Sequence, residues 1–157
     1  MIAIVDYGVG NLFSLRSSLA HLGLDAVVTA DPAVLRAADR IILPGVGAFG
    51  DAMAKLEATG LVPVIREEAR KKPLLGICLG MQLLFEKSYE YGEHAGLGFV
   101  PGEVCPLEPD LKDPALKVPQ IGWNALHIVR DDPLFRYIRE GEYVYYVHSY
   151  YGRHCEA

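Results

Sequence analysis

Short apolar runs alternate with helical patterns over the first half of the chain. Four runs are predicted to be β-strands: residues 2–6, 25–30, 40–43 and 74–77. Helices are predicted at residues 12–22, in a short segment that starts at Asp31-Pro32, at 51–58, at 61–71 and from Leu79 through Phe85. Because strands and helices alternate, the pattern predicts an α/β fold with a right-handed, doubly wound, mainly parallel sheet.

From Tyr89 onward the pattern changes, because glycine and proline interrupt any long helix. Short, mostly antiparallel strands are predicted at residues 98–105, 124–129 and 142–147, with a short helix at 132–137. A length of 157 residues suits one domain with a real core, and we find no internal repeat or low-complexity tract.

One cysteine lies at a strand-to-helix junction between two glycines, in the run Gly76-Ile77-Cys78-Leu79-Gly80. Gly-x-Cys-x-Gly is the cysteine form of the nucleophile elbow, a sharp turn that places the reactive atom above the sheet. A helix that begins at this turn directs its free N–H groups toward the sulfur and favours the thiolate. The alternative is a structural cysteine buried in an apolar run.

A second glycine-rich loop, residues 44–50, follows the predicted strand 40–43. Ligands bind at this rim of an open parallel sheet, although a plain strand-to-helix connection has the same composition. If strands 40–43 and 74–77 are neighbours, the N–H groups of Gly45, Val46 and Gly47 face the cysteine sulfur. Together with the N–H of Leu79 they would form an oxyanion hole.

Composition narrows the class of protein. A net charge of −5 without a Lys/Arg run argues against nucleic acid as the main partner, and no apolar run reaches the ~18 residues that span a bilayer. Cys78, Cys105 and Cys155 are widely spaced and odd in number, so we expect no disulfide framework, no metal site and a cytoplasmic location. The glycine turn at residues 7–11 does not complete a Gly-x-Gly-x-x-Gly dinucleotide motif.

Several of these segments together resemble a known family. Residues 76–82 (GICLGMQ) and 43–49 (LPGVGAF) resemble the triad-type, class I glutamine amidotransferases. More narrowly, residues 6–12 (DYGVGNL), 50–53 (GDAM) and 122–124 (GWN) are similar to the glutaminase subunits of imidazole glycerol phosphate synthases. The resemblance implies a flavodoxin-like fold and a single amidotransferase domain over residues 1–157.

The resemblance also implies a chemistry. Cys78 would attack the side-chain amide of glutamine, form a glutamyl thioester and release ammonia, and water would then free glutamate. Gln82 would help to hold the glutamine, together with the main chain of Ser149 and Tyr150. No cofactor is implied.

A partner is implied as well. In this family ammonia passes to a (β/α)₈-barrel cyclase subunit that makes imidazole glycerol phosphate in histidine biosynthesis. Asn11, Trp123 and Tyr145 match positions that face this cyclase. From the residues alone, Trp123 fits a core tryptophan as well as an exposed interface anchor.

The sequence departs from the family in one respect. The general base and its orienting glutamate come in the family as His-Pro-Glu, but none of the five histidines here is followed by proline. His148 ends a predicted strand near the glutamine-binding segment, yet its matched position in the family is not the base. We therefore expect a domain incomplete at its C-terminus, with its last strands truncated, that is inactive alone.

Two other interpretations stay open. The chain could be a docking module that keeps the partner-facing surface without turnover. It could also be another cysteine-elbow α/β protein, such as a relative of the small stress-response chaperone and peptidase-like family, although the segments at 43–49 and 122–124 speak against this.

Overall fold

The computed structural model describes residues 1–155, which form two compact units. The first unit comprises Met1–Cys105 and the segment from Gly152, and the second is Pro106–Tyr151. Within the described residues, no helix combines the length and apolar character needed to cross a bilayer.

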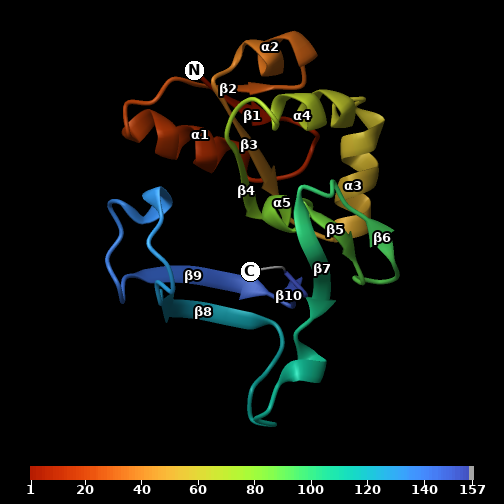
Figure 1. The fold of residues 1–157 in the computed structure, drawn as a ribbon, viewed down its shortest axis with the longest axis vertical. Coiled ribbons are helices and arrows are strands. Elements are labelled where there is room, and N and C mark those ends of the chain that lie inside the picture. Colours follow the sequence, from red (N-terminus) through yellow and green to blue (C-terminus); the bar gives the residue numbers. More distant parts are fainter. Residues whose placement is uncertain (156–157) are drawn as a thin grey trace. The chain divides into compact units, whose positions relative to one another are not determined.

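The first unit is built on a four-stranded parallel sheet, as the apolar runs predict (Figure 1). Its strands are β1 (Ile2–Val5), β2 (Ala26–Thr29), β3 (Arg40–Gly45) and β4 (Leu74–Cys78). Their order is β2-β1-β3-β4, which is the start of the flavodoxin-like order, so the predicted fold class is confirmed. Among the described strands β4 has a neighbour on one side only, and its Leu75 and Ile77 side chains are exposed.

Helices connect the parallel strands and bury the sheet. They are α1 (Leu12–His21), α2 (Pro32–Ala37), α3 (Phe49–Ala58) and α4 (Val62–Glu68). Leu19 of α1 packs in a buried cluster with Ile2, Ile4 and Ile42, which share one face of the sheet. Figure 1 shows α1 and α3 on opposite sides of the strands, the doubly wound arrangement that the alternation predicts.

The helix after Cys78 is much shorter than predicted. Helix α5 spans only Leu79–Gln82, and Phe85–Ser88 forms strand β5 instead of continuing the helix. Phe85 is buried and pairs with Val100 of strand β7 (Val100–Pro106). The helical periodicity through Phe85 is therefore overridden by strand pairing with a segment that is distant in sequence.

A second sheet completes the first unit, with the order β10-β7-β5-β6. Strands β6 (His94–Ala95) and β10 (Tyr150–Arg153) are not predicted from the sequence pattern. Strand β5 pairs antiparallel with β6 but parallel with β7, so the expectation of mostly antiparallel pairing is only partly right here.

The second unit contains an antiparallel pair, β8 (Gln120–Ala125) and β9 (Tyr143–His148), and two short 3₁₀ helices, η1 (Glu108–Asp110) and η2 (Pro133–Phe135). The predicted strand at 124–129 is placed about four residues too late. The reason is that the Glu140 carboxylate, not a neighbouring strand, accepts the N–H of Ile128 at 2.7 Å. Residues 126–130 are therefore a loop rather than a strand.

Candidate active site

Cys78 occupies the turn between β4 and α5 in a strained backbone conformation. Its φ of 56° and ψ of −120° lie where side-chain-bearing residues rarely occur, and only Tyr91 and His154 share a positive φ among the described non-glycine residues. Its side chain is exposed, so the alternative of a buried structural cysteine is wrong. This geometry is that of a nucleophile elbow.

Three glycines make the elbow possible because backbone segments pass very close to one another. A Cβ on Gly80 would lie 1.9 Å from the carbonyl oxygen of Leu43, and one on Gly76 would lie 2.5 Å from Cα of Met81. A Cβ on Gly45 would lie 2.5 Å from the amide nitrogen of Gly80. A larger residue at Gly45 or Gly80 would push the elbow away from β3, and one at Gly76 would push α5 away from β4.

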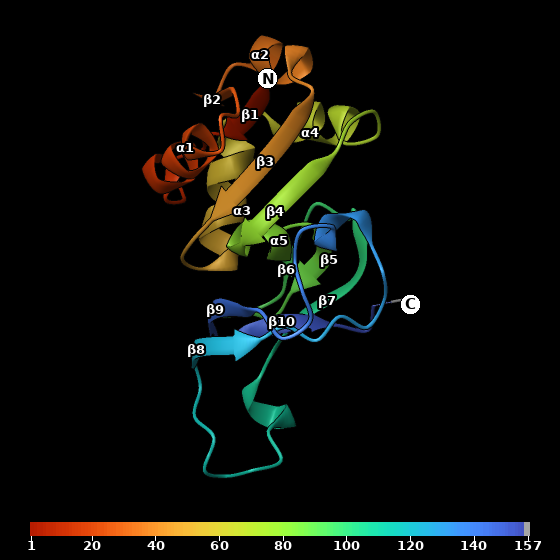
Figure 2. The same cartoon turned by 90° about the vertical axis from the view of Figure 1, so that its left-hand side faces the viewer.

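The glycine-rich loop lies beside the elbow, as the sequence predicts. Strands β3 and β4 are parallel neighbours, and Gly45 is paired in register with Cys78 (Figure 2). Gly45 also lies against the main chain of Leu79. Beyond it the chain turns at Gly47, whose φ of 94° favours glycine, and Val46 is half exposed.

Tyr7 anchors this loop from the turn that follows the neighbouring strand β1. Its buried hydroxyl donates a 2.6 Å hydrogen bond to the carbonyl oxygen of Pro44, the residue before Gly45. Burial raises the pKa of Tyr7 to about 12, so the hydroxyl keeps its proton and remains a donor at neutral pH. Sequence reasoning missed this residue, because Tyr7 and Pro44 are 37 positions apart.

Replacing Tyr7 with phenylalanine is expected to lower the free energy of unfolding by about 1–2 kcal/mol, since a buried carbonyl loses a donor. The stability of the native chain should also fall as pH rises from 10 toward 12, because the unfolded tyrosine ionises first. Urea unfolding of Tyr7→Phe tests the first statement, with Tyr91→Phe as the control because Tyr91 is 86% exposed. Urea unfolding of the native chain between pH 10 and pH 12 tests the second. Equal unfolding midpoints for the two variants would contradict the anchoring role.

Glu90 is a second residue that sequence reasoning missed. Helix α3 begins directly after the glycine-rich loop, and its N-cap residue Ala48 has no side chain that can cap it. The Glu90 carboxylate accepts the N–H of Phe49 at 2.7 Å and so satisfies one of the free donors of the first turn. The loop is thus fixed at its start by Tyr7 and at its end by Glu90.

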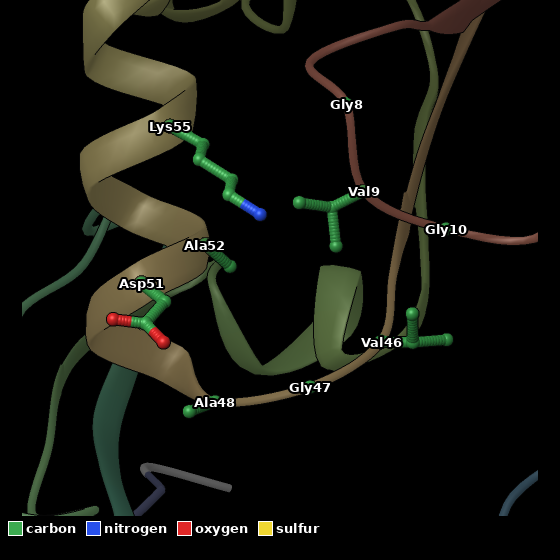
Figure 3. A pocket seen from close by; sticks show the side chains of 9 residues that line it. All are labelled: Gly8, Val9, Gly10, Val46, Gly47, Ala48, Asp51, Ala52 and Lys55. Carbon is green, nitrogen blue, oxygen red and sulfur yellow. The ribbon is translucent and has the colours of Figure 1, made fainter.

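A cavity of about 300 Å³ adjoins the loop. It lies between the turns that follow β1 and β3, where the strand order of the sheet reverses and where ligands bind in open α/β sheets. In Figure 3, Lys55 of α3 extends across it toward Val9 on the opposite wall, and the segment with Val46 and Gly47 runs along the bottom of the view. Cys78 does not line this cavity.

The residues predicted to hold glutamine belong to different parts of the chain. Gln82 is the last residue of α5 and is half-buried, one turn beyond Cys78 in the first unit. Ser149 and Tyr150 belong to the second unit, where the Ser149 carbonyl accepts the N–H of Leu107 at 2.9 Å. Their roles stay predictions.

The residues predicted to face a partner are all exposed. Asn11 has a structural task as well, because its side chain accepts the N–H of Ser14 at 3.1 Å and caps α1. Trp123 and Tyr145 face each other across β8 and β9, with ring centroids 5.5 Å apart in an edge-to-face arrangement. Trp123 is 67% exposed, which favours the interface interpretation over a core tryptophan.

Among the described residues, the group that could hold a metal ion is Glu103, Cys105 and His154. Glu103 and Cys105 lie on β7 of the second sheet and His154 just after β10, so none of the three belongs to the elbow or to the glycine-rich loop.

Comparison with known proteins agrees with this geometry. The family model described as glutamine amidotransferase class-I matches residues 3–156. The imidazole glycerol phosphate synthase subunit HisH of Wolinella succinogenes is 50% identical over 153 residues, covering 97% of this chain and 75% of that protein. The subunit of the same name from Moorella thermoacetica is 55% identical over 151 residues, covering 96% of this chain and 70% of that protein.

A solved structure supports the fold. A crystal structure of a glutamine amidotransferase superposes with a TM-score of 0.68 at 15% identity, covering 98% of this chain and 74% of that chain. The match of the family model and the identity to the HisH proteins extend over nearly the whole of the 157 residues. The chain belongs to the class-I glutamine amidotransferase family and, within it, to the HisH subunits of imidazole glycerol phosphate synthase.

Proposed function

We propose that Cys78 is the nucleophile with which this chain hydrolyses glutamine. The chain is a glutamine amidotransferase subunit of imidazole glycerol phosphate synthase, an enzyme of histidine biosynthesis. The observation that carries the assignment to Cys78 is its exposed position on a strained elbow, in register with Gly45 of the neighbouring strand.

The reaction proceeds through a covalent intermediate. The Cys78 thiolate attacks the carbonyl carbon of the glutamine side-chain amide, a C–S bond forms, and the C–N bond breaks as the nitrogen takes up a proton and leaves as ammonia. Water then attacks the thioester, which releases glutamate and regenerates the thiol. The exposed position of the sulfur supports this role, since substrate must reach it.

Main-chain amides stabilise the negative charge that develops on the amide oxygen. The donors are the N–H of Leu79 and N–H groups from Gly45, Val46 and Gly47. The approach of Gly45 to the main chain of Leu79 and Gly80 supports this pairing of donors. Each such donor is worth about 10²- to 10³-fold in kcat.

Gln82, Ser149 and Tyr150 bind glutamine in this proposal. Gln82 can donate and accept hydrogen bonds. Main-chain N–H and C=O groups, the kind that Ser149 and Tyr150 carry, match the α-carboxylate and α-amino ends of the substrate, and the Ser149 carbonyl would use its second lone pair because it already accepts the N–H of Leu107. The half-buried position of Gln82 one turn after the nucleophile supports its part.

The proton donor for departing ammonia is not assigned to a residue of this site. No histidine of the 157 residues precedes a proline, so the His-Pro-Glu run that the family resemblance implies does not occur in them. General acid–base catalysis contributes about 10²- to 10⁴-fold, so residues 1–157 by themselves would form the thioester slowly. The alternative function is a docking module without turnover.

A glutamine-analogue diazo-ketone separates the candidates. It should alkylate Cys78, and glutamine should protect the thiol in proportion to its concentration. Labelling that glutamine does not affect would contradict the binding of glutamine beside Cys78. Absence of labelling together with tight partner binding would point to a docking module.

The ammonia is used by a partner. We propose that a (β/α)₈-barrel cyclase subunit binds Asn11 of the first unit and Trp123 and Tyr145 of the second, and that the complex works in the cytoplasm. The exposed aromatic pair on β8 and β9 supports the first point, since Trp and Tyr are enriched at interface hot spots. The absence of any disulfide among the three cysteines, all within the described chain, is in keeping with the second.

Trp123→Ala is expected to weaken binding of the cyclase by at least about 30-fold, because a hot-spot aromatic contributes about 2 kcal/mol or more. Circular dichroism should show a folded chain, since Trp123 is 67% exposed. Titration calorimetry with the cyclase measures the change, and Tyr91→Ala is the control because Tyr91 is 86% exposed on the first unit. Equal affinities of the two variants would remove Trp123 from the interface.

A further inference from the structure

Three side chains with metal-binding atoms converge on the second sheet, outside the proposed glutaminase site. The carboxylate of Glu103, the thiol of Cys105 and the imidazole of His154 have ligand atoms that all lie within 4.8 Å of one another. Glu103 and Cys105 are two residues apart on β7 and so share a face of that strand. His154 follows β10, the neighbour of β7 in the sheet.

We propose that Glu103, Cys105 and His154 bind one zinc ion or a similar divalent transition metal. Sulfur, imidazole nitrogen and carboxylate oxygen are the three donor types that zinc accepts, and a mixed set of this kind suits zinc better than magnesium or calcium. In a tetrahedral zinc site with bonds of about 2.0–2.3 Å, ligand atoms lie about 3.3–3.8 Å apart. Movements of about 1 Å would bring these atoms to that spacing.

The carboxylate is already oriented for such a role. Oε1 of Glu103 is held by Nζ of Lys87 and by the hydroxyl of Tyr89, each at 3.2 Å. Oε2 of Glu103 faces His154, whose Nδ1 lies 3.1 Å away. Outer hydrogen bonds of this kind fix the orientation of ligating carboxylates in metal sites.

The three ligands differ in how far solvent reaches them. Cys105 is buried, the Glu103 side chain is 23% exposed and that of His154 is 61% exposed. An ion would therefore enter from the histidine side and displace the proton of the Cys105 thiol to solvent on binding. The fourth position would face solvent and take water.

Charge sets a moderate affinity. With the metal bound, the Glu103 carboxylate and the Cys105 thiolate are both negative. The Lys87 ammonium beside Glu103 is positive and repels the metal ion. The ligands and Lys87 together carry a net charge of −1, so the electrostatic attraction for zinc is weaker than in a site built from several thiolates.

The sequence expectation of no metal site rests on spacing along the chain. Glu103 and His154 are 51 positions apart, and no Cys-x-x-Cys occurs, so a search for adjacent ligands finds nothing. Only the pairing of β7 and β10 brings the three side chains together.

The zinc site would tie the segment after β10 to β7. Residue 154 has a φ of 54°, a left-handed conformation that a histidine adopts at a cost, and a metal ligand at this point would hold it. We expect zinc to raise the thermal midpoint of the chain without being needed for glutamine chemistry.

The test uses the 157-residue chain carrying Cys78→Ser, so that the proposed nucleophile does not bind the probe metal. Zinc titrated against a chromophoric chelator should bind once per chain. Cobalt(II) should give a thiolate-to-metal charge-transfer band, which reports a sulfur ligand directly. His154→Ala and Glu103→Gln should each weaken binding more than about tenfold.

Two controls separate this site from other metal-binding groups. Nδ1 of His127 lies 2.6 Å from Oε1 of Glu140, which makes a histidine–carboxylate pair without a cysteine ligand. The His127→Gln variant should therefore bind zinc as the parent does. Cys155→Ser should also leave binding unchanged, while Cys105→Ala should remove the charge-transfer band. Cys105 is buried, so Cys105→Ala could fail to fold. In that case His154→Ala still tests the proposal, because the His154 side chain is 61% exposed.

The proposal is overturned by any of three results. The first is zinc affinity that is the same in the parent, His154→Ala and Glu103→Gln. The second is a cobalt complex without a thiolate band. The third is binding that depends on Cys155 or His127 instead of on the three named residues.

Discussion

Replacing Cys78 with alanine is expected to abolish glutamine-dependent synthesis of imidazole glycerol phosphate by the assembled enzyme, while synthesis from added ammonia continues. The reason is that the substitution removes the sulfur proposed to form the thioester but leaves the residues proposed to bind the cyclase unchanged. Loss of a nucleophile of this type lowers kcat by roughly 10⁴- to 10⁶-fold, which takes glutamine hydrolysis to background.

The measurement compares glutamine and ammonium chloride as nitrogen sources for the complex of each variant with its cyclase. Cys155→Ala is the matched control, because Cys155 is also an exposed thiol of the first unit. It should keep the parent's rate with each nitrogen source. If Cys78→Ala lost the ammonia-dependent activity as well, the separation of glutaminase and cyclase roles would be wrong.

Replacing Gly80 with alanine is expected to cost about 3 kcal/mol or more of the free energy of unfolding. The added Cβ would lie 1.9 Å from the carbonyl oxygen of Leu43, and neither partner is the flexible end of a side chain. Overpacking usually costs about 1–3 kcal/mol, and a backbone-to-backbone clash belongs at the upper end. The elbow would have to move away from β3, so glutamine hydrolysis should fall too.

Gly60→Ala is the control for this substitution. Gly60 has a φ of 72° but no atom within 4 Å of an added Cβ, so the change costs only the left-handed strain of about 1–2 kcal/mol. Chemical denaturation of both variants measures the difference. Similar stabilities would show that β3 and the elbow can separate easily.

The sequence predicts the parts of the molecule that depend on local pattern. The four parallel strands appear within one or two residues of the predicted bounds, because each is a short apolar run followed by a turn residue. The neighbour relation of β3 and β4 follows from their order in a doubly wound sheet. Gly76 and Gly80 mark the elbow because only glycine fits where backbones approach so closely.

The sequence fails where distant segments decide the outcome. The apolar positions at Leu83, Leu84 and Phe85 fit a helix, yet pairing with β7 makes Phe85–Ser88 a strand. Tyr7 and Glu90 contact the glycine-rich loop across 37 and 41 positions of sequence, and neither lies in a motif that marks such a contact. A hydrogen bond of this kind has no periodicity to detect.

Strand β4 has a consequence for handling the protein. Its outer edge, which pairs with no other described strand, and its exposed Leu75 and Ile77 offer a template on which another polypeptide can add as an extra strand. The strand that presents Cys78 can therefore also be captured by foreign chains. Precipitation and loss of activity during storage would then both result from strand addition to β4, and a ligand that covers this edge would delay both.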